Sequence, residues 1–143
     1  MKALLQVGSF AAWRIPLFLD RTPAPSAIIV LQGRLDTDIA AHLEIEIDHI
    51  IKEVDDNGHI ILHGDAGDFG FSSDVFHSNG LEAIDGRGIK MLFDCYIKAI
   101  PRNIQFVFVL SSPLLRNRTL PFPVLYGSKA IEEYLCSLHA FPV

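Results

Sequence analysis

An unbroken run of β-branched and aliphatic residues, Ala27-Ile28-Ile29-Val30-Leu31-Gln32, constrains the fold of this chain more than any other feature. A strand with one solvated face alternates apolar and polar residues, and this run shows no such alternation. The run therefore predicts a strand that is covered on both faces, as in a parallel sheet with crossover helices.

A helix is predicted directly after this strand. Asp36, Thr37 and Asp38 provide an N-cap and negative charge for its first turn. Apolar residues then recur at steps of four, four, three and four, which places them on one helical face. This stripe consists of Ile39, Leu43, Ile47, Ile50 and Val54. Asn57-Gly58 ends the helix, because both residues tolerate left-handed backbone.

The rest of the chain alternates predicted strands and helices. Further strands are expected within residues 4–19 with a break around Ala11-Ala12, at His59–His63, at Ile104–Leu110 and, at a sheet edge, at Phe122–Tyr126. Further helices are expected from Leu81, or from Arg87 if Gly86 and Gly88 interrupt it, to Ile100 before Pro101, and from Ser128 onward. This order predicts an α/β fold with a single mixed, mainly parallel sheet.

Length and composition exclude several classes of protein. The 143 residues suit one domain, residues 1–143, and the net charge of −5 argues against nucleic-acid binding. No apolar run approaches the roughly 18–20 residues of a membrane-spanning helix, so no membrane association is expected. The two cysteines, Cys95 and Cys136, resemble reduced intracellular thiols, which favours a cytoplasmic location.

The strand ending in Gly33-Arg34-Leu35-Asp36, followed by a helix, resembles the start of STAS domains. These are the anti-sigma-factor antagonists and the cytoplasmic modules of sulfate transporters. The resemblance covers residues 27–138 and ends on Phe122–Ile131, which is similar to the last strand and helix of that family. It implies a STAS-like regulatory or protein-interaction module, either a signalling antagonist or a small-ligand-binding domain. It also implies a kinase or an anti-sigma-like regulator as partner, and no cofactor.

The antagonists carry Asp-Ser-Ser-Gly-Leu at the start of the helix after their third strand, and a partner kinase phosphorylates the first serine. The stretch compared with it here is Phe71-Ser72-Ser73-Asp74-Val75. The serine pair is kept, but Phe71 replaces the acid and Asp74 replaces the glycine. The resemblance is therefore to the divergent group that lacks this signature. Ser72 is a candidate phosphorylation site, and the alternative is that Ser72 or Ser73 only caps a helix.

The expected contact surface is the loop and short helix between Gly64 and Gly80, together with the end of the strand before Asp36. Ligands of open α/β sheets bind outside the carboxyl ends of strands, and both segments follow such ends. The apolar side chains of the loop also favour a homodimer. The predicted surface residues are Asp36, Thr37, Phe69, Phe71, Ser72, Ser73, Asp74 and Phe76.

A second family gives an alternative function. Leu62-His63-Gly64, then Phe69, then Asp74-Val75 is similar to the crotonase pattern Leu-Thr-Gly … Phe-x-x-Gly-x-Asp-Leu. This resemblance implies a truncated crotonase-like protein that binds or converts an acyl-CoA thioester. Because the second glycine-rich oxyanion segment is absent, we favour a protein that is not an enzyme, and no catalytic residue is assigned.

The histidines give no metal-site pattern. His42 and His49 share a helix face but lie about 10–11 Å apart along the axis, which is too far for one zinc ion. No cysteine or carboxylate spacing completes a site around His59 and His63. We expect surface or boundary histidines and no metal.

Overall fold

The computed structural model describes residues 2–19, 26–54, 56–64, 81–110, 120–126 and 140–142, and all structural statements below concern these residues. The strands are β1 (Lys2–Val7), β2 (Phe10–Leu19), β3 (Ser26–Leu35), β4 (His59–His63), β5 (Leu81–Ile84), β6 (Gln105–Leu110), β7 (Val124–Tyr126) and β8 (Ala140–Pro142). The helices are α1 (Thr37–Glu53), α2 (Gly86–Ala99) and the short 3₁₀ helix η2 (Ile100–Arg102).

The strands form one mixed sheet in the order β1-β2-β3-β4-β6-β7, with β5 also paired to β3 and β8 to β2. The pairs β3–β4, β4–β6, β6–β7 and β3–β5 are parallel. β1, β2 and β3 pair antiparallel, as do β2 and β8. This topology confirms the predicted α/β class. The strand predicted at Phe122–Tyr126 lies at the end of the described strand order, as expected, but it begins only at Val124, after Pro123.

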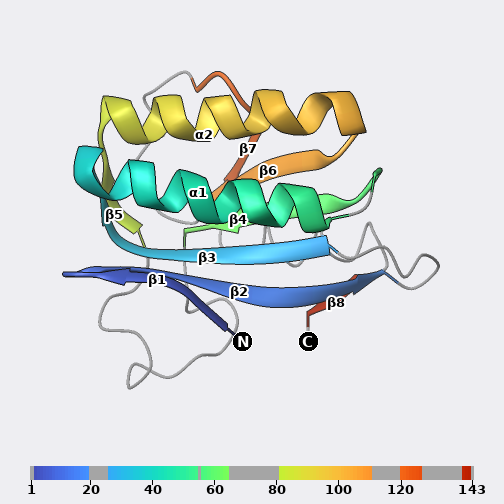
Figure 1. Cartoon of the computed structure of the whole chain (residues 1–143), viewed down its shortest axis with the longest axis horizontal. Coiled ribbons are helices and arrows are strands. Elements are labelled where there is room, and N and C mark those ends of the chain that lie inside the picture. The colour runs from blue at the N-terminus through green and yellow to red at the C-terminus, as the bar shows by residue number, and fades with distance from the viewer. Residues whose placement is uncertain are drawn as a thin grey trace.

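Both long helices pack side by side on one face of the sheet and run in the same direction (Figure 1). The predicted stripe of α1 faces the sheet, since all five of its residues are buried. The opposite face of β3 is also closed, because Ile28 and Val30 have no exposed surface. The prediction of a strand that is covered on both faces is therefore confirmed.

The structure corrects two element boundaries. The break in the first predicted strand lies at Gly8 and Ser9, where Gly8 has φ +58°, and not at Ala11-Ala12, which lie within β2. The second helix begins at Gly86 and not at Leu81, close to the alternative start at Arg87. The residues from Leu81 to Ile84 are strand β5, because they pair with the end of β3.

Gly33 marks the point at which β3 changes partner. Residues Ala27–Val30 pair with β4, whereas Gly33–Leu35 pair with β5, with a register shift directly after Gly33. The φ of Gly33 is +91°, and a Cβ there would lie 2.3 Å from the carbonyl oxygen of Ser9. The glycine of the Gly-x-Leu-Asp element is thus required by backbone conformation and by close packing.

One helix end follows the predicted signal, since α2 ends at Ala99, with Pro101 in the 3₁₀ turn. The other ends before it, because the C-cap of α1 is Val54 in extended backbone, and Asn57, with φ 67°, lies three residues further on. The guanidinium of Arg102 donates to the carbonyl oxygens of Ile51 and Val54, which satisfies acceptors at the end of α1.

One histidine prediction is wrong. His63 has no exposed surface, because it ends β4 between the paired strands β3 and β6. His42 and His49 are exposed, as expected. Within the described ranges, no three His, Cys, Asp or Glu side chains gather in a way that could hold a metal ion, and no helix is long and apolar enough to cross a membrane. The helix predicted from Ser128 lies outside the described residues.

Candidate functional site

Two helices start side by side at one edge of the sheet. Leu35 at the end of β3 pairs with Ile84 at the end of β5, and each strand leads through one aspartate into a helix. The Oδ1 atom of Asp36 accepts hydrogen bonds of 3.1 Å from two backbone N–H groups of α1. The Oδ1 atom of Asp85 accepts a 2.8 Å bond from the N–H of Gly88 in α2. Both helices therefore begin with an aspartate N-cap.

The two caps are joined to each other. The hydroxyl of Thr37, the first residue of α1, donates a 3.0 Å hydrogen bond to Oδ2 of Asp85. The backbone N–H of Asp85 also donates to the carbonyl oxygen of Leu35 at 3.1 Å. The bond from Gly88 N–H, followed by that from Thr37, lowers the pKa of Asp85 below its ordinary value.

We call this edge the helix-start face and define it as Asp36, Thr37, Asp85, Gly86 and Arg87. All of these residues are exposed except Asp85, which is half-buried. Because the two acids are occupied by capping bonds, the exposed side chains that remain available on this face include the guanidinium of Arg87.

Gly88 sets the distance between α2 and the strands. A Cβ at this position would lie 2.9 Å from Cγ1 of Ile84 and 3.1 Å from both Cγ and the carbonyl oxygen of Leu35. The helix thus packs closely against the ends of β3 and β5 only because residue 88 has no side chain.

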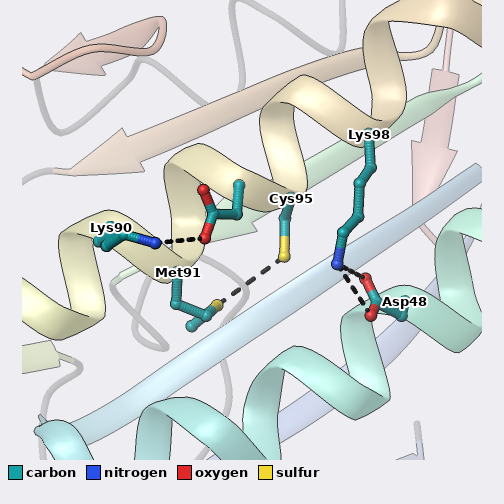
Figure 2. Close-up of polar contacts among 6 residues, drawn as sticks. Asp48, Lys90, Met91, Cys95 and Lys98 are labelled. Carbon is teal, nitrogen blue, oxygen red and sulfur yellow. Dashed lines mark hydrogen bonds and ion pairs between the residues drawn. The ribbon is translucent and has the colours of Figure 1, made fainter.

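A groove of about 240 Å³ runs between α1 and α2 from the helix-start face. We call it the α1–α2 groove, and its lining residues are Thr37, Ala40, Ala41, Glu44, Arg87, Lys90, Met91 and Asp94. One turn beyond its last lining residues, Nζ of Lys98 contacts both carboxylate oxygens of Asp48, at 3.0 and 3.1 Å (Figure 2). This contact raises the pKa of Lys98.

The thiol on the buried side of α2 is not suited to nucleophilic chemistry. Cys95 is fully buried, and burial raises its pKa to about 12. Its Sγ lies 3.8 Å from Sδ of Met91, on the inner side of α2 (Figure 2). Cys95 therefore acts as an apolar packing residue.

Of the predicted contact residues, Asp36 and Thr37 lie together on the helix-start face. The other six lie outside the described residues: Phe69, Phe71, Ser72, Ser73, Asp74 and Phe76.

Sequence reasoning missed Asp85 and Arg87 as site residues. A signal for them exists, because Asp85-Gly86-Arg87-Gly88-Ile89 consists of the N-cap and the first four residues of the amphipathic helix α2. This segment agrees with Asp-Ser-Ser-Gly-Leu in its acid and its glycine, and has an aliphatic residue at the last position. In this chain the hydrogen bond from Gly88 N–H to Asp85 and the close packing of Gly88 give the acid and the glycine each a structural role at this spacing.

Comparisons with known proteins support the fold. No family model matches the sequence, and no curated protein matches it. Among solved structures, the anti-sigma factor antagonist SpoIIAA in its unphosphorylated form has a TM-score of 0.55 at 15% identity, covering 86% of this chain and 97% of that one. An anti-sigma factor antagonist from Mycobacterium paratuberculosis has a TM-score of 0.60 at 14% identity, covering 94% of this chain and 99% of that one. The chain therefore has the STAS-like α/β fold that these antagonists share.

Proposed function

We propose that this chain is a single STAS-like domain that acts as a non-catalytic regulatory module, by binding a protein partner through the helix-start face. The observation that carries the proposal is the convergence of two capped helix starts at the carboxyl ends of β3 and β5, with Arg87 exposed beside a groove. This is the edge at which open α/β sheets bind their ligands.

The similar structures support a partner from signalling. Both are anti-sigma factor antagonists, so a kinase or an anti-sigma-like regulator is the class of partner that we propose. Neither structure supports the crotonase alternative.

We further propose that Asp85–Ile89, rather than Phe71–Val75, occupies the position of the Asp-Ser-Ser-Gly-Leu signature. Gly86 and Arg87 then stand where that signature has its two serines, and neither side chain can accept a phosphate on a hydroxyl. Partner binding at this helix start would thus not be switched by phosphorylation there. Ser72 stays a candidate phosphorylation site outside the described residues.

Quantitative capture from a lysate of the source organism tests the partner-binding proposal. We expect tagged wild-type protein to enrich one specific protein and Arg87→Gln to reduce that enrichment. Lys52→Gln is the matched control, because Lys52 is an exposed cation in the last turn of α1, at the opposite end of the helix. Equal capture by all three proteins would contradict a role of the helix-start face.

The crotonase alternative needs a separate assay. Wild-type protein is incubated with a short-chain enoyl-CoA, and thioester hydrolysis and hydration are followed by absorbance. A turnover above background that is lost in Asp74→Ala, without any specific protein capture, would favour the acyl-CoA function over the regulatory one.

Self-association is a further part of the proposal. The apolar side chains at Phe69, Phe71 and Phe76 are the expected homodimer contacts. Light scattering should give the mass of two chains for the wild type and of one chain for Phe76→Ala. A monomeric wild type would remove the homodimer from the proposed function.

A further inference from the structure

The lining residues give the α1–α2 groove a defined length between two contacts that join the helices. Thr37 is bonded to Asp85 at the helix starts. Asp48 is bonded to Lys98 one turn beyond the last lining residues (Figure 2). On each helix, the first and last lining positions are seven residues apart in sequence. At a rise of 1.5 Å per residue this is about 10 Å, or about two helical turns.

The charges of the groove are divided along its axis. Arg87 and Lys90 line the half near the helix starts, and Glu44 and Asp94 line the other half. Lys90 lies 3.1 Å from Asp94, but their side chains are 73% and 40% exposed, so this contact is weak and replaceable. No hydrogen bond or ion pair joins Arg87 or Glu44 to another side chain in the described part of the chain. The lining of the groove therefore has no net charge, but its positive charges lie at one end and its negative charges at the other.

The floor of the groove is apolar. Ala40 and Met91 are only 5% and 4% exposed, and Ala41 lies beside them. The small alanine side chains leave room above the floor, and a methionine adapts its shape to a neighbouring aliphatic group. A single aliphatic side chain between the two charged halves fits this arrangement.

The carboxylate of Asp85 lies beside the positive half and keeps its negative charge. Its oxygens already accept hydrogen bonds from the N–H of Gly88 and the hydroxyl of Thr37, so they are less accessible to an incoming segment. The cations that face an incoming segment are thus the exposed side chains of Arg87 and Lys90.

We propose that the α1–α2 groove binds one helix of a protein partner, which presents an acidic residue, an aliphatic residue one turn away and a basic residue two turns away. The acid would pair with Arg87 and Lys90, the aliphatic side chain would rest on Ala40 and Met91, and the base would pair with Glu44. Helices with such spacing bind grooves by one face. This inference rests on the proposed function, since it specifies the partner of the same site.

Three peptides of 18 residues, blocked at both ends and identical outside three positions, test the inference. Positions i, i+4 and i+7 carry Glu-Leu-Lys, Glu-Leu-Glu or Lys-Leu-Lys. Affinities are measured by chemical-shift titration of ¹⁵N-labelled protein. We expect the Glu-Leu-Lys peptide to bind about tenfold more tightly than either other peptide, given the modest energy of each exposed pair. The shifts should centre on Ala40, Ala41 and Met91.

Charge variants give the matching result from the protein side. Arg87→Glu with Lys90→Glu makes the groove wholly acidic, so this variant should prefer the Lys-Leu-Lys peptide. Glu44→Lys with Asp94→Lys should prefer the Glu-Leu-Glu peptide. This second variant tests the inference even if the first variant does not fold. Equal affinities for the three peptides, shifts elsewhere, or no shifts at all would overturn the inference.

The lysate capture separates this inference from the proposed function. If the wild type captures a partner and Glu44→Lys with Asp94→Lys captures it equally, the groove is not the binding site, although the helix-start face still binds the partner, because neither residue belongs to that face. If the wild type captures nothing specific, the proposed function itself fails.

Discussion

The hydroxyl of Thr37 donates a 3.0 Å hydrogen bond to the carboxylate of Asp85, across 48 positions of sequence. The first residue of α1 is thereby joined to the residue that caps α2. Because Asp85 also binds the N–H of Gly88, one carboxylate connects both helix starts. The carboxylate of Asp85 therefore holds the two helix starts next to each other.

Replacement of Asp85 should show this connection. Asp85→Ala removes an N-cap acceptor, and we expect the free energy of unfolding to fall by about 1 kcal/mol. Asp85→Asn keeps an acceptor oxygen and should lose less. Urea denaturation followed by circular dichroism measures both values. An unchanged midpoint for Asp85→Ala would contradict the capping role.

The pH dependence of stability should also differ between wild type and Asp85→Asn. The pKa of Asp85 is lowered from 3.8 by folding, so its ionised form stabilises the native state above that pH. This contribution is lost as the pH falls from 3.8 through the lower pKa of the folded state. The free energy of unfolding of the wild type should therefore exceed that of Asp85→Asn by less and less below pH 3.8. A difference that stays constant with pH would contradict the lowered pKa of Asp85.

Two glycines of α2 should respond in opposite ways to alanine. Gly88→Ala places a Cβ against the carbonyl oxygen of Leu35, and we expect a loss of about 1–3 kcal/mol. Gly86→Ala meets nothing within 4 Å and should be neutral or stabilise by about 0.5 kcal/mol. Thermal unfolding of both variants compares them directly. Similar melting temperatures of the two variants would show that the fold accommodates a Cβ at residue 88 without loss of stability.

Gly33→Ala should be more damaging than any other glycine substitution proposed here. It combines a φ of +91° with a contact of 2.3 Å to the Ser9 carbonyl oxygen, and we expect a loss of at least about 3 kcal/mol. Gly8→Ala is the matched variant, since Gly8 also has positive φ but open space around it. Its cost should stay near 1 kcal/mol, the usual penalty for left-handed backbone. Equal losses would show that the close contact at Gly33 relaxes without cost.

The bridge between Asp48 and Lys98 should contribute little at neutral pH. Its side chains are 29% and 47% exposed, so a double-mutant cycle with Asp48→Asn and Lys98→Met should give a coupling of about 0.5 kcal/mol. The pKa of Lys98 is raised above 10.5, so its contribution is complete below that pH and disappears as the pH rises through the folded value. Denaturation at pH 7 and at pH 11 or above measures this loss, and a coupling that grows at high pH would contradict it.

Much of the fold follows from local sequence patterns. The stripe from Ile39 to Val54 predicts a helix face that is buried, and the run from Ala27 to Gln32 predicts a strand that is covered on both sides. Both patterns are strong because each contains many residues with one periodicity. Asp36 is likewise identifiable as an N-cap from its position between strand and helix.

The errors arise where distant residues decide the structure. Leu81-Glu82-Ala83-Ile84 has good intrinsic helix propensity, and only its pairing with the end of β3 makes it a strand. The same information is needed to see that Asp85 caps a helix beside Asp36. His63 is polar in sequence, but its place between two neighbouring strands buries it.

The change of partner along β3 also restricts how the chain can vary. The segment from Val30 to Asp36 must pair with β4 at its first residue, pair with β5 at Gly33–Leu35, and then cap α1. A single added or deleted residue would turn Leu35 to the wrong side and separate the two aspartate caps. Diverged homologues should therefore tolerate residue substitutions in this segment but keep its length constant. A constant length of this segment, rather than conserved residues within it, would then identify such homologues.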